Sequence, residues 1–128
     1  MRNTKKMAIN LIVESFDKYE TSFKENVKGK FENEDEIIKC SYNSELGFCE
    51  IVREKEKVFM VRKGSNSINL YFDNLGNGEC QIKNEYFEKN LFIKNGKIEL
   101  DKKFLEISYE LYDFKEEFNS LRIRVTKF

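Results

Sequence analysis

Apolar and polar side chains alternate over many short stretches of this chain. Near the N-terminus, Ile9, Leu11 and Val13 recur at every second residue. This spacing places side chains on one face of a β-strand, because successive residues of a strand point to opposite faces. We therefore predict a first strand over residues 7–15, and the same alternation near the C-terminus predicts a last strand over residues 121–127.

The segment that follows the first strand fits two patterns. Phe16, Tyr19, Phe23 and Val27 have the spacing of one helical face, whereas alternation with gaps also accounts for the apolar positions. We predict a second strand within residues 16–31, with a short helical turn as the alternative.

From residue 36 onward, apolar runs of about four to eight residues are separated by Gly, Asn and Asp, which is typical of a meander of antiparallel strands. With the first two strands and the last one, about ten short strands result. The predicted central strands cover residues 37–42, 48–53, 58–62, 68–72, 80–83, 86–93, 97–100 and 104–112.

Two dipeptides predict tight hairpin turns between these strands. Asn77-Gly78 and Asn95-Gly96 can each supply the positive φ angles that two-residue hairpin turns require. Asn95-Gly96 is the stronger signal, because apolar residues flank it on both sides. Residues 113–119 predict either a longer loop or one helical turn.

Many short strands with tight connections and no βαβ rhythm indicate an antiparallel sandwich or a closed barrel. Proline residues commonly protect the edge strand of an open sheet from pairing with another chain, and this chain has none. A closed barrel has no exposed sheet edge, so the composition favours it. The length of 128 residues suits one domain, over residues 1–128.

Composition narrows the functions further. The chain has 12 Phe and 6 Tyr, which predict an aromatic core, and no His, the commonest ligand of transition metals. Its 23 Lys and Arg balance its 23 Asp and Glu, so overall charge gives no attraction to a phosphate backbone. We expect no nucleic-acid partner and no cofactor.

The three cysteines, Cys40, Cys49 and Cys80, are an odd number in a chain without the apolar start of a signal peptide. We expect reduced, buried thiols and a cytoplasmic location. Residues 7–13 are apolar but too short for a membrane span of about 20 residues, and they contain Asn10. A soluble protein without a membrane partner is the expectation.

A family resemblance extends over most of the chain. It rests on a Lys-Gly-aromatic stretch, on a Tyr before a Leu-Gly turn, on an Arg-x-Gly, on a Phe-acid pair and on a closing hairpin. The corresponding residues are 27–31, 38–42, Leu46-Gly47, Arg62-Lys63-Gly64, Phe72-Asp73, 96–98, 107–111 and 121–123. In their order and spacing these stretches resemble the YwiB-like family of uncharacterised bacterial proteins.

The resemblance implies a calycin-like fold, the closed antiparallel barrel of about 8–10 strands that lipocalins and fatty-acid-binding proteins share. No biochemical activity is established for the family, so the resemblance implies none. The chain departs from the family pattern after Phe72, where residues 74–78 replace the expected Tyr-x-Thr-type stretch.

Five residues form the predicted ligand-binding set: Arg62, Gly64, Tyr109, Arg122 and Arg124. Arg62 could bind a carboxylate or phosphate at the mouth of a barrel, and Gly64 permits an unusual backbone geometry beside it. A structural role for this pair, with the arginine at a strand end and the glycine in the turn, is the alternative that we favour. Arg122 and Arg124 share one face of the last strand. They point outward by default, and only an inward orientation would let them bind an acidic head group.

Catalysis is not expected. A cysteine nucleophile needs an activating base, which is most often His, and the cysteine spacing matches no common zinc site. Carboxylates at residues 34–36, Glu54, Glu56 and residues 116–117 could form the acid and base of a hydrolase, but they are interleaved with Lys and read as solvated turns.

Three functions follow, in order of preference. The first is a barrel that binds a small apolar or amphipathic molecule in its lumen, without enzymatic activity. The second is a protein-protein interaction module, a homodimer whose barrel is filled by its own side chains and whose outer surface carries an aromatic patch. The third is a hydrolase with paired carboxylates. The first of these rests on fold analogy.

Overall fold

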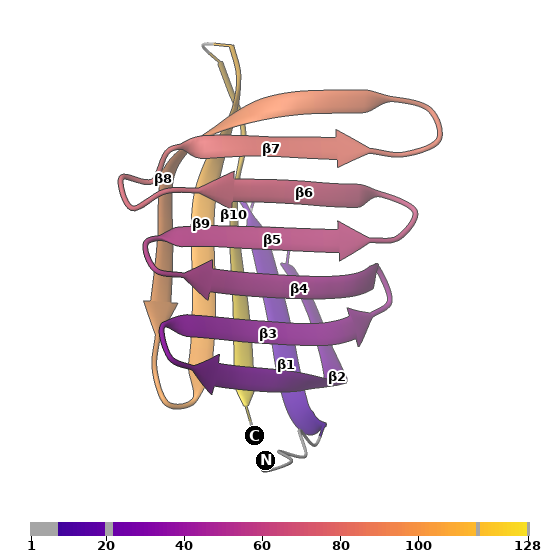
Figure 1. Ribbon diagram of the computed structural model, residues 1–128. Coiled ribbons are helices and arrows are strands. Elements are labelled where there is room, and N and C mark those ends of the chain that lie inside the picture. The colour runs from indigo at the N-terminus through magenta and orange to yellow at the C-terminus, as the bar shows by residue number, and fades with distance from the viewer. Residues whose placement is uncertain (1–7, 20–21, 115, 128) are drawn as a thin grey trace.

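In this computed structural model, which describes residues 8–19, 22–114 and 116–127, ten antiparallel strands form one closed barrel (Figure 1). None of these residues forms a helix that could cross a membrane. The strands are β1 (Ile9–Asp17), β2 (Ser22–Glu34), β3 (Ile37–Ser44), β4 (Gly47–Glu54), β5 (Lys57–Lys63), β6 (Ser67–Phe72), β7 (Gly78–Lys83), β8 (Glu88–Leu100), β9 (Phe104–Asp113) and β10 (Glu116–Lys127). The predicted fold class, an all-β closed antiparallel barrel, is confirmed.

The strands follow one another around the barrel in sequence order, and β1 pairs with β10 to close it. Figure 1 shows two layers that cross at a steep angle. The front sheet contains β3 to β7, and the rear sheet contains β9, β10 and β1. The two longest strands, β2 and β8, have 13 residues each and pair with a neighbour in both layers.

Glycines lie at both corners where a strand passes from one layer to the other. β2 changes partner at Gly29, which faces β1 and β3 at once, and a Cβ atom there would stand 2.6 Å from Leu11 Cδ1 and 2.8 Å from Tyr42 Cβ. β8 bends at Asn95 and Gly96, between the register positions of Lys94 and Lys97. Bulges and glycines of this kind let a strand bend sharply.

The corner of β8 overturns one prediction. The sequence predicted two strands, over residues 86–93 and 97–100, joined by a hairpin at Asn95-Gly96. The structure has a single strand, β8, in which these residues form a bulge. Asn95 has the positive φ of 55° that the pattern requires, but Gly96 does not, so the chain bends without reversing.

The other ambiguous segments resolve as strands. Strand is confirmed over most of residues 16–31, and the described part of this segment contains no helical turn. The long loop predicted over residues 113–119 is wrong, because β9 continues to Asp113 and β10 begins at Glu116. Residue 7, predicted to begin the first strand, lies outside the described residues.

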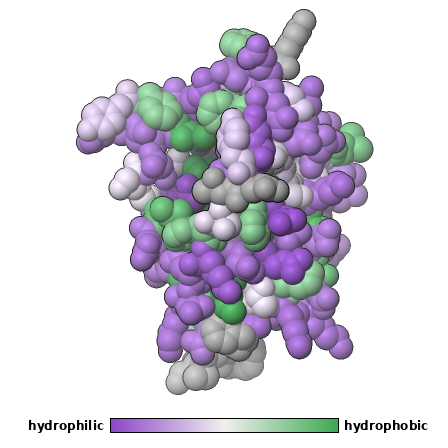
Figure 2. Space-filling model, turned by 180° about the vertical axis from the view of Figure 1, so that it is seen from behind, coloured by the Kyte–Doolittle hydropathy of each residue, from purple (hydrophilic) through white to green (hydrophobic). Residues whose placement is uncertain are grey.

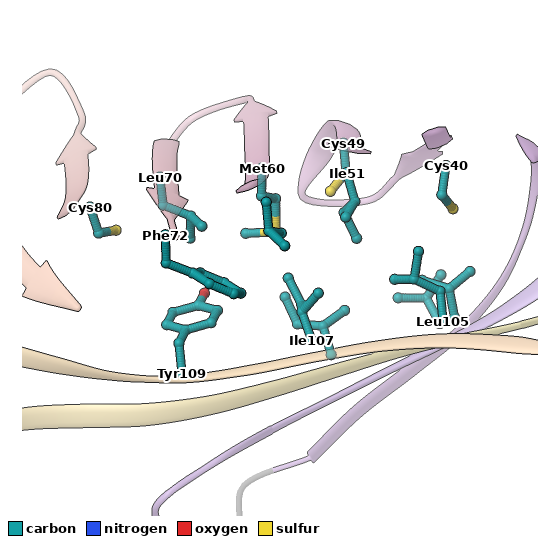
Figure 3. Close-up of a cluster of buried hydrophobic side chains, with 14 of the residues drawn as sticks. Cys40, Cys49, Ile51, Met60, Leu70, Phe72, Cys80, Leu105, Ile107 and Tyr109 are labelled. Carbon is teal, nitrogen blue, oxygen red and sulfur yellow. The ribbon is translucent and has the colours of Figure 1, made fainter. Parts of the chain in front are cut away.

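The lumen is filled by apolar side chains that both layers direct inward. Nineteen buried hydrophobic residues form one cluster, and β1 and β3 to β10 all contribute to it. Figure 3 shows Leu105 and Ile107 of β9 facing the front sheet, from which Ile51 and Met60 project toward them. The predicted aromatic core is wrong in its composition. Of the aromatic residues that the structure describes, only Phe72, Tyr42 and Tyr109 are buried, and the rest of the cluster is mainly aliphatic.

Candidate functional site

Arg62 of β5 lies on the inner wall of the barrel. Its register neighbours are Cys49 of β4 and Ile68 of β6, and Cys49 pairs in turn with Tyr42 of β3. Cys49 and Tyr42 are buried in the lumen. Because residues opposite each other in register share a face of the sheet, the arginine enters the barrel from the same face. It also continues the inward alternation of Val58 and Met60 along β5.

Tyr109 approaches this region from the opposite wall. It projects from β9, is buried, and turns its hydroxyl toward the front sheet beside Phe72 (Figure 3). Burial raises the pKa of Tyr109, the Cys80 thiol raises it further, and the charge of Arg62 acts against both effects. Burial also raises the pKa of Tyr42. A hydrogen bond with the Cys49 thiol adds to the effect of burial on the pKa of Tyr42, so its hydroxyl already has a partner within the barrel.

None of the described residues forms an ion pair with the guanidinium group of Arg62. Its Nε atom is buried and lacks a hydrogen-bond partner. Within the part of the chain that the structure describes, the ion pairs are Lys39 with Glu50, Lys89 with Asp113, and Arg124 with Glu106, so no carboxylate compensates Arg62. A partly buried charge without a partner is costly in folding free energy, and its presence is a reason to look for a ligand.

A hollow of about 220 Å³ opens beside Arg62 at the end of the barrel. It lies between the β3–β4 turn and the β5–β6 turn, and its lining residues are Glu45, Leu46, Gly47, Arg62, Gly64, Ser65 and Asn66. Gly64 allows the two turns to approach closely, since a Cβ atom there would stand 3.1 Å from the Leu46 carbonyl carbon. Of the five predicted residues, the structure thus places Arg62 and Gly64 at this hollow, whereas Tyr109 lies deeper in the core beside Phe72 (Figure 3) and is among the lining residues of a different hollow.

Further inward residues with charged side chains were not predicted from the sequence. Arg53 of β4 alternates with the buried Cys49 and Ile51, and its Nε atom, like that of Arg62, is buried without a hydrogen-bond partner. Glu25 of β2 accepts a hydrogen bond of 3.1 Å from the Glu45 backbone, while its second oxygen is buried without a partner. Lys89 of β8 pairs with Asp113 at 2.7 Å. Glu25 and Lys89 each lie two residues from an apolar inward residue of their own strand. Because every second residue of a strand points to the same face, this spacing in the sequence could have predicted their inward orientation.

Arg122 and Arg124 have the outward orientation that the sequence predicted by default, which removes them from the predicted ligand-binding set in the lumen. Both alternate with buried residues of β10 and lie on the outer wall of the barrel. The Arg124 guanidinium stacks 4.3 Å from the Phe104 ring and pairs with Glu106 at 2.9 Å, and Arg122 lies 4.6 Å from the centre of the Phe16 ring. A ligand role in the lumen required an inward orientation, so neither arginine takes part in it.

The outer wall of the rear sheet carries a larger hollow, of about 710 Å³. Ser108, Ser120 and Arg122 are among its lining residues, together with the carboxylate of Glu110. Glu110 accepts hydrogen bonds from Asn95 and from the Tyr112 hydroxyl, at 2.9 and 3.0 Å. Figure 2 shows this side of the molecule, where hydrophilic residues predominate and hydrophobic ones are scattered. The lining of the hollow is mainly polar, and it also includes Tyr109 and Leu121, whose side chains belong to or pack against the core.

The cysteines are buried and free, as predicted. Burial raises the pKa of the Cys40 and Cys80 thiols to about 12 and raises that of Cys49 as well. Thiols of this kind are poor nucleophiles, because the thiolate is the reactive form. Among the described residues, no group of three or more acidic or cysteine side chains could hold a metal ion.

The carboxylates that the sequence suggested for a hydrolase lie at strand ends and turns. Glu34 and Glu54 end β2 and β4, Glu56 lies in the turn before β5, and Glu116 begins β10 at the opposite end of the meander. Glu45 is the acidic residue in the lining of the hollow beside Arg62. The second carboxylate at this end is that of Glu25, which accepts a hydrogen bond from the Glu45 backbone, and neither of the two belongs to the carboxylates that the sequence suggested for a hydrolase.

No protein-family profile and no curated protein sequence matches the chain. Among solved structures, the crystal structure of the YwiB protein from Bacillus subtilis matches it with a TM-score of 0.65 and 17% sequence identity. The match covers 96% of this chain and 93% of the other. This likeness shows the fold, and it agrees with the resemblance to the YwiB-like family that the order of the sequence motifs indicates.

Proposed function

We propose that this barrel binds a small amphipathic acid and that Arg62 recognises the acidic group. The observation that carries the proposal is the arginine itself. Its side chain enters the barrel from the inner wall, its Nε atom is buried without a hydrogen-bond partner, and no described carboxylate pairs with it. An anionic ligand would supply the missing counter-ion.

The surroundings of Arg62 suit an anion. The planar guanidinium group binds carboxylate or phosphate through two parallel hydrogen bonds. Its neighbour Tyr109 carries a hydroxyl group that is neutral at pH 7, as phenols ordinarily are, and burial raises the pKa of this group further. A neutral phenol donates a hydrogen bond to an anion without adding a repelling charge.

The filled lumen limits the size of the ligand. Buried residues from both layers occupy the interior, including Ile51, Met60 and Ile107 (Figure 3). Of the two hollows that Arg62 lines, the one between the β3–β4 and β5–β6 turns has about 220 Å³ and suits a short molecule better than a long-chain fatty acid. The other, of about 440 Å³, lies largely along outward residues such as Val61, Asn69 and Gln81. The acidic group would meet Arg62, and the apolar part would lie along the adjoining wall near Leu46.

The proposal involves no chemical reaction, cofactor or nucleic acid. It also assigns the barrel to the calycin-like class and the protein to the cytoplasm. The meander of ten antiparallel strands supports the first assignment, and three free buried cysteines, which persist in a reducing compartment, support the second.

Native mass spectrometry of gently purified protein, followed by titration calorimetry, tests the proposal. We expect a bound acid that is released on denaturation, or binding of octanoate and octyl phosphate but not of octanol. Arg62→Met should abolish this binding. Arg122→Met, which removes an arginine from the outer wall, should leave it unchanged. Equal binding of octanoate and octanol, or binding that survives Arg62→Met, would contradict the assignment of Arg62.

A further inference from the structure

The outer face of the front sheet carries a row of side chains that runs across five neighbouring strands, from β3 to β7. In register order the row consists of Lys39, Val52, Phe59, Tyr71 and Glu79. These residues alternate with inward residues along their strands, so they point away from the lumen. We refer to them as the aromatic row; Figure 1 shows the front sheet from this side.

The apolar centre of the aromatic row is exposed. Phe59 is 38% exposed and Tyr71 is 40% exposed, although both are large aromatic side chains. Phe92 of β8 follows Glu79 in the register and is 50% exposed. Neighbouring exposed aromatics differ from scattered ones, because they form a continuous surface that a partner can cover.

From this pattern we infer that the aromatic row is the contact between two copies of the chain. The two copies are related by a twofold axis that runs parallel to β5 and passes beside Phe59. Such an axis reverses the row, so that Phe59 faces its own counterpart and Val52 faces Tyr71 of the second copy. Lys39 then faces Glu79 of the second copy, at both ends. A twofold contact of this kind uses the same surface on both copies and needs no other partner.

The charges at the two ends of the row favour this arrangement. Glu79 lies between Tyr71 and Phe92, and no cation of the described chain forms an ion pair with it. Lys39 forms an ion pair with Glu50 at a long distance of 3.9 Å, and Glu32 of β2 lies opposite it in register. Lys39 and Glu79 face each other only when the row is reversed, so the charges favour a twofold axis parallel to β5 over a twofold axis that runs along the row.

The surface also has a space that the second copy can fill. A hollow of about 260 Å³ lies on the outer wall beside Tyr71 and Glu79, with Asn69, Gln81 and Asn90 among its lining residues. The proposed axis directs the Lys39 and Val52 side chains of the second copy toward this hollow.

Two lysines limit the extent of the contact. Lys57 and Lys63 lie on the same outer face of β5, so each comes close to its counterpart across the axis. Repulsion between like charges confines close packing to the row itself. We therefore expect a small interface and a dissociation constant on the order of 10 µM. This inference is independent of ligand binding at Arg62.

Sedimentation velocity at about 5 to 500 µM protein provides the first test. We expect a shift from monomer to dimer over this range. A protein that stays monomeric throughout, or one that forms only larger open assemblies, would overturn the proposal.

A charge-reversal cycle provides the second test. Lys39→Glu and Glu79→Lys should each weaken the dimer at least about tenfold, and the double variant should restore it. The two residues lie on strands β3 and β7, about 19 Å apart within one copy at the usual strand spacing. Only contact between two copies can therefore produce the restoration. Lys97→Glu, on the rear sheet, should not change the dimer. Failure of the double variant to recover would overturn the twofold arrangement.

Discussion

Gly96 donates a backbone hydrogen bond of 3.0 Å to the carbonyl oxygen of Gly76. This bond fastens the corner of β8 to the β6–β7 turn. The corner also lies against Phe72, because a Cβ atom added to Gly96 would stand 2.6 Å from the phenylalanine ring. Gly96 therefore lies at the bend of β8, where it contacts both the β6–β7 turn and the Phe72 ring of the core.

Replacing Gly96 by Ala should destabilise the barrel by about 1 to 3 kcal/mol, the usual effect of adding a methyl group to a packed core. The cause is steric, because the Phe72 ring is buried and has to move. Urea unfolding followed by circular dichroism measures the effect. Lys97→Ala, at the exposed neighbouring position, should change stability by less than about 0.5 kcal/mol. Equal stabilities of the two variants would contradict the contact with Phe72.

The same corner shows how far the sequence could predict the fold. Alternation and turn residues predicted a closed antiparallel barrel and most of its strands. The prediction of a hairpin at Asn95-Gly96 was wrong because the same dipeptide favours a positive φ angle both in a hairpin turn and in a bulge within one strand. Whether the chain reverses or bends there depends on Gly76 and Phe72, which are distant in sequence. Local propensity carries no information about such contacts.

The candidate site could be predicted only in part for a related reason. Val58, Phe59, Met60 and Val61 make β5 apolar on both faces, so its sequence does not show whether Arg62 points inward. The register with Cys49 decides it. The arginines of β10 lie opposite a clear apolar face, and there the alternation alone favoured the outward orientation that the structure has.

Two leucines allow a test of the filled lumen. Leu105 is fully buried, whereas Leu75 is 77% exposed in the β6–β7 turn. Leu105→Ala should lower the free energy of unfolding by about 2 to 5 kcal/mol, because it leaves a cavity among side chains from both layers. Leu75→Ala should change it by less than about 0.5 kcal/mol. Urea denaturation measures both, and a small effect at position 105 would mean that the lumen is loosely packed.

Stability should fall as pH rises above about 9. The pKa of Cys40 and Cys80 is about 12 in the folded protein, against 9.0 for an ordinary thiol. Between these values the unfolded chain loses protons that the folded chain keeps, which favours unfolding. Each thiol contributes up to about 1.4 kcal/mol per pH unit in this window.

Urea midpoints measured between about pH 8 and 10 should show this decline, before the buried tyrosines add to it. The double variant with Cys40→Ala and Cys80→Ala should have a shallower slope over the same range. An unchanged slope would mean that these thiols titrate alike in the folded and unfolded chain. Below about pH 8 the cysteines should contribute no pH dependence.

Arg62 should cost stability in the absence of ligand. Its Nε atom is buried without a partner, so a neutral side chain of similar length avoids the loss of hydration that folding imposes on the charge. We expect Arg62→Met to raise the free energy of unfolding by about 1 kcal/mol, a moderate value because the arginine is only half-buried. Arg122→Met removes a guanidinium group that stacks on Phe16 at the surface and should bring no gain.

Denaturant unfolding of the two variants, without and with octanoate, separates the contributions. Without ligand, Arg62→Met should be the more stable protein. With ligand, the original chain should gain stability, because binding to the folded state shifts the equilibrium, whereas Arg62→Met should not. A loss of stability on Arg62→Met without ligand would show that the guanidinium group has a favourable partner within the barrel. A charge that is retained at a cost to the free protein, and that stabilises the protein only when an anion is present, is the behaviour expected of a binding residue.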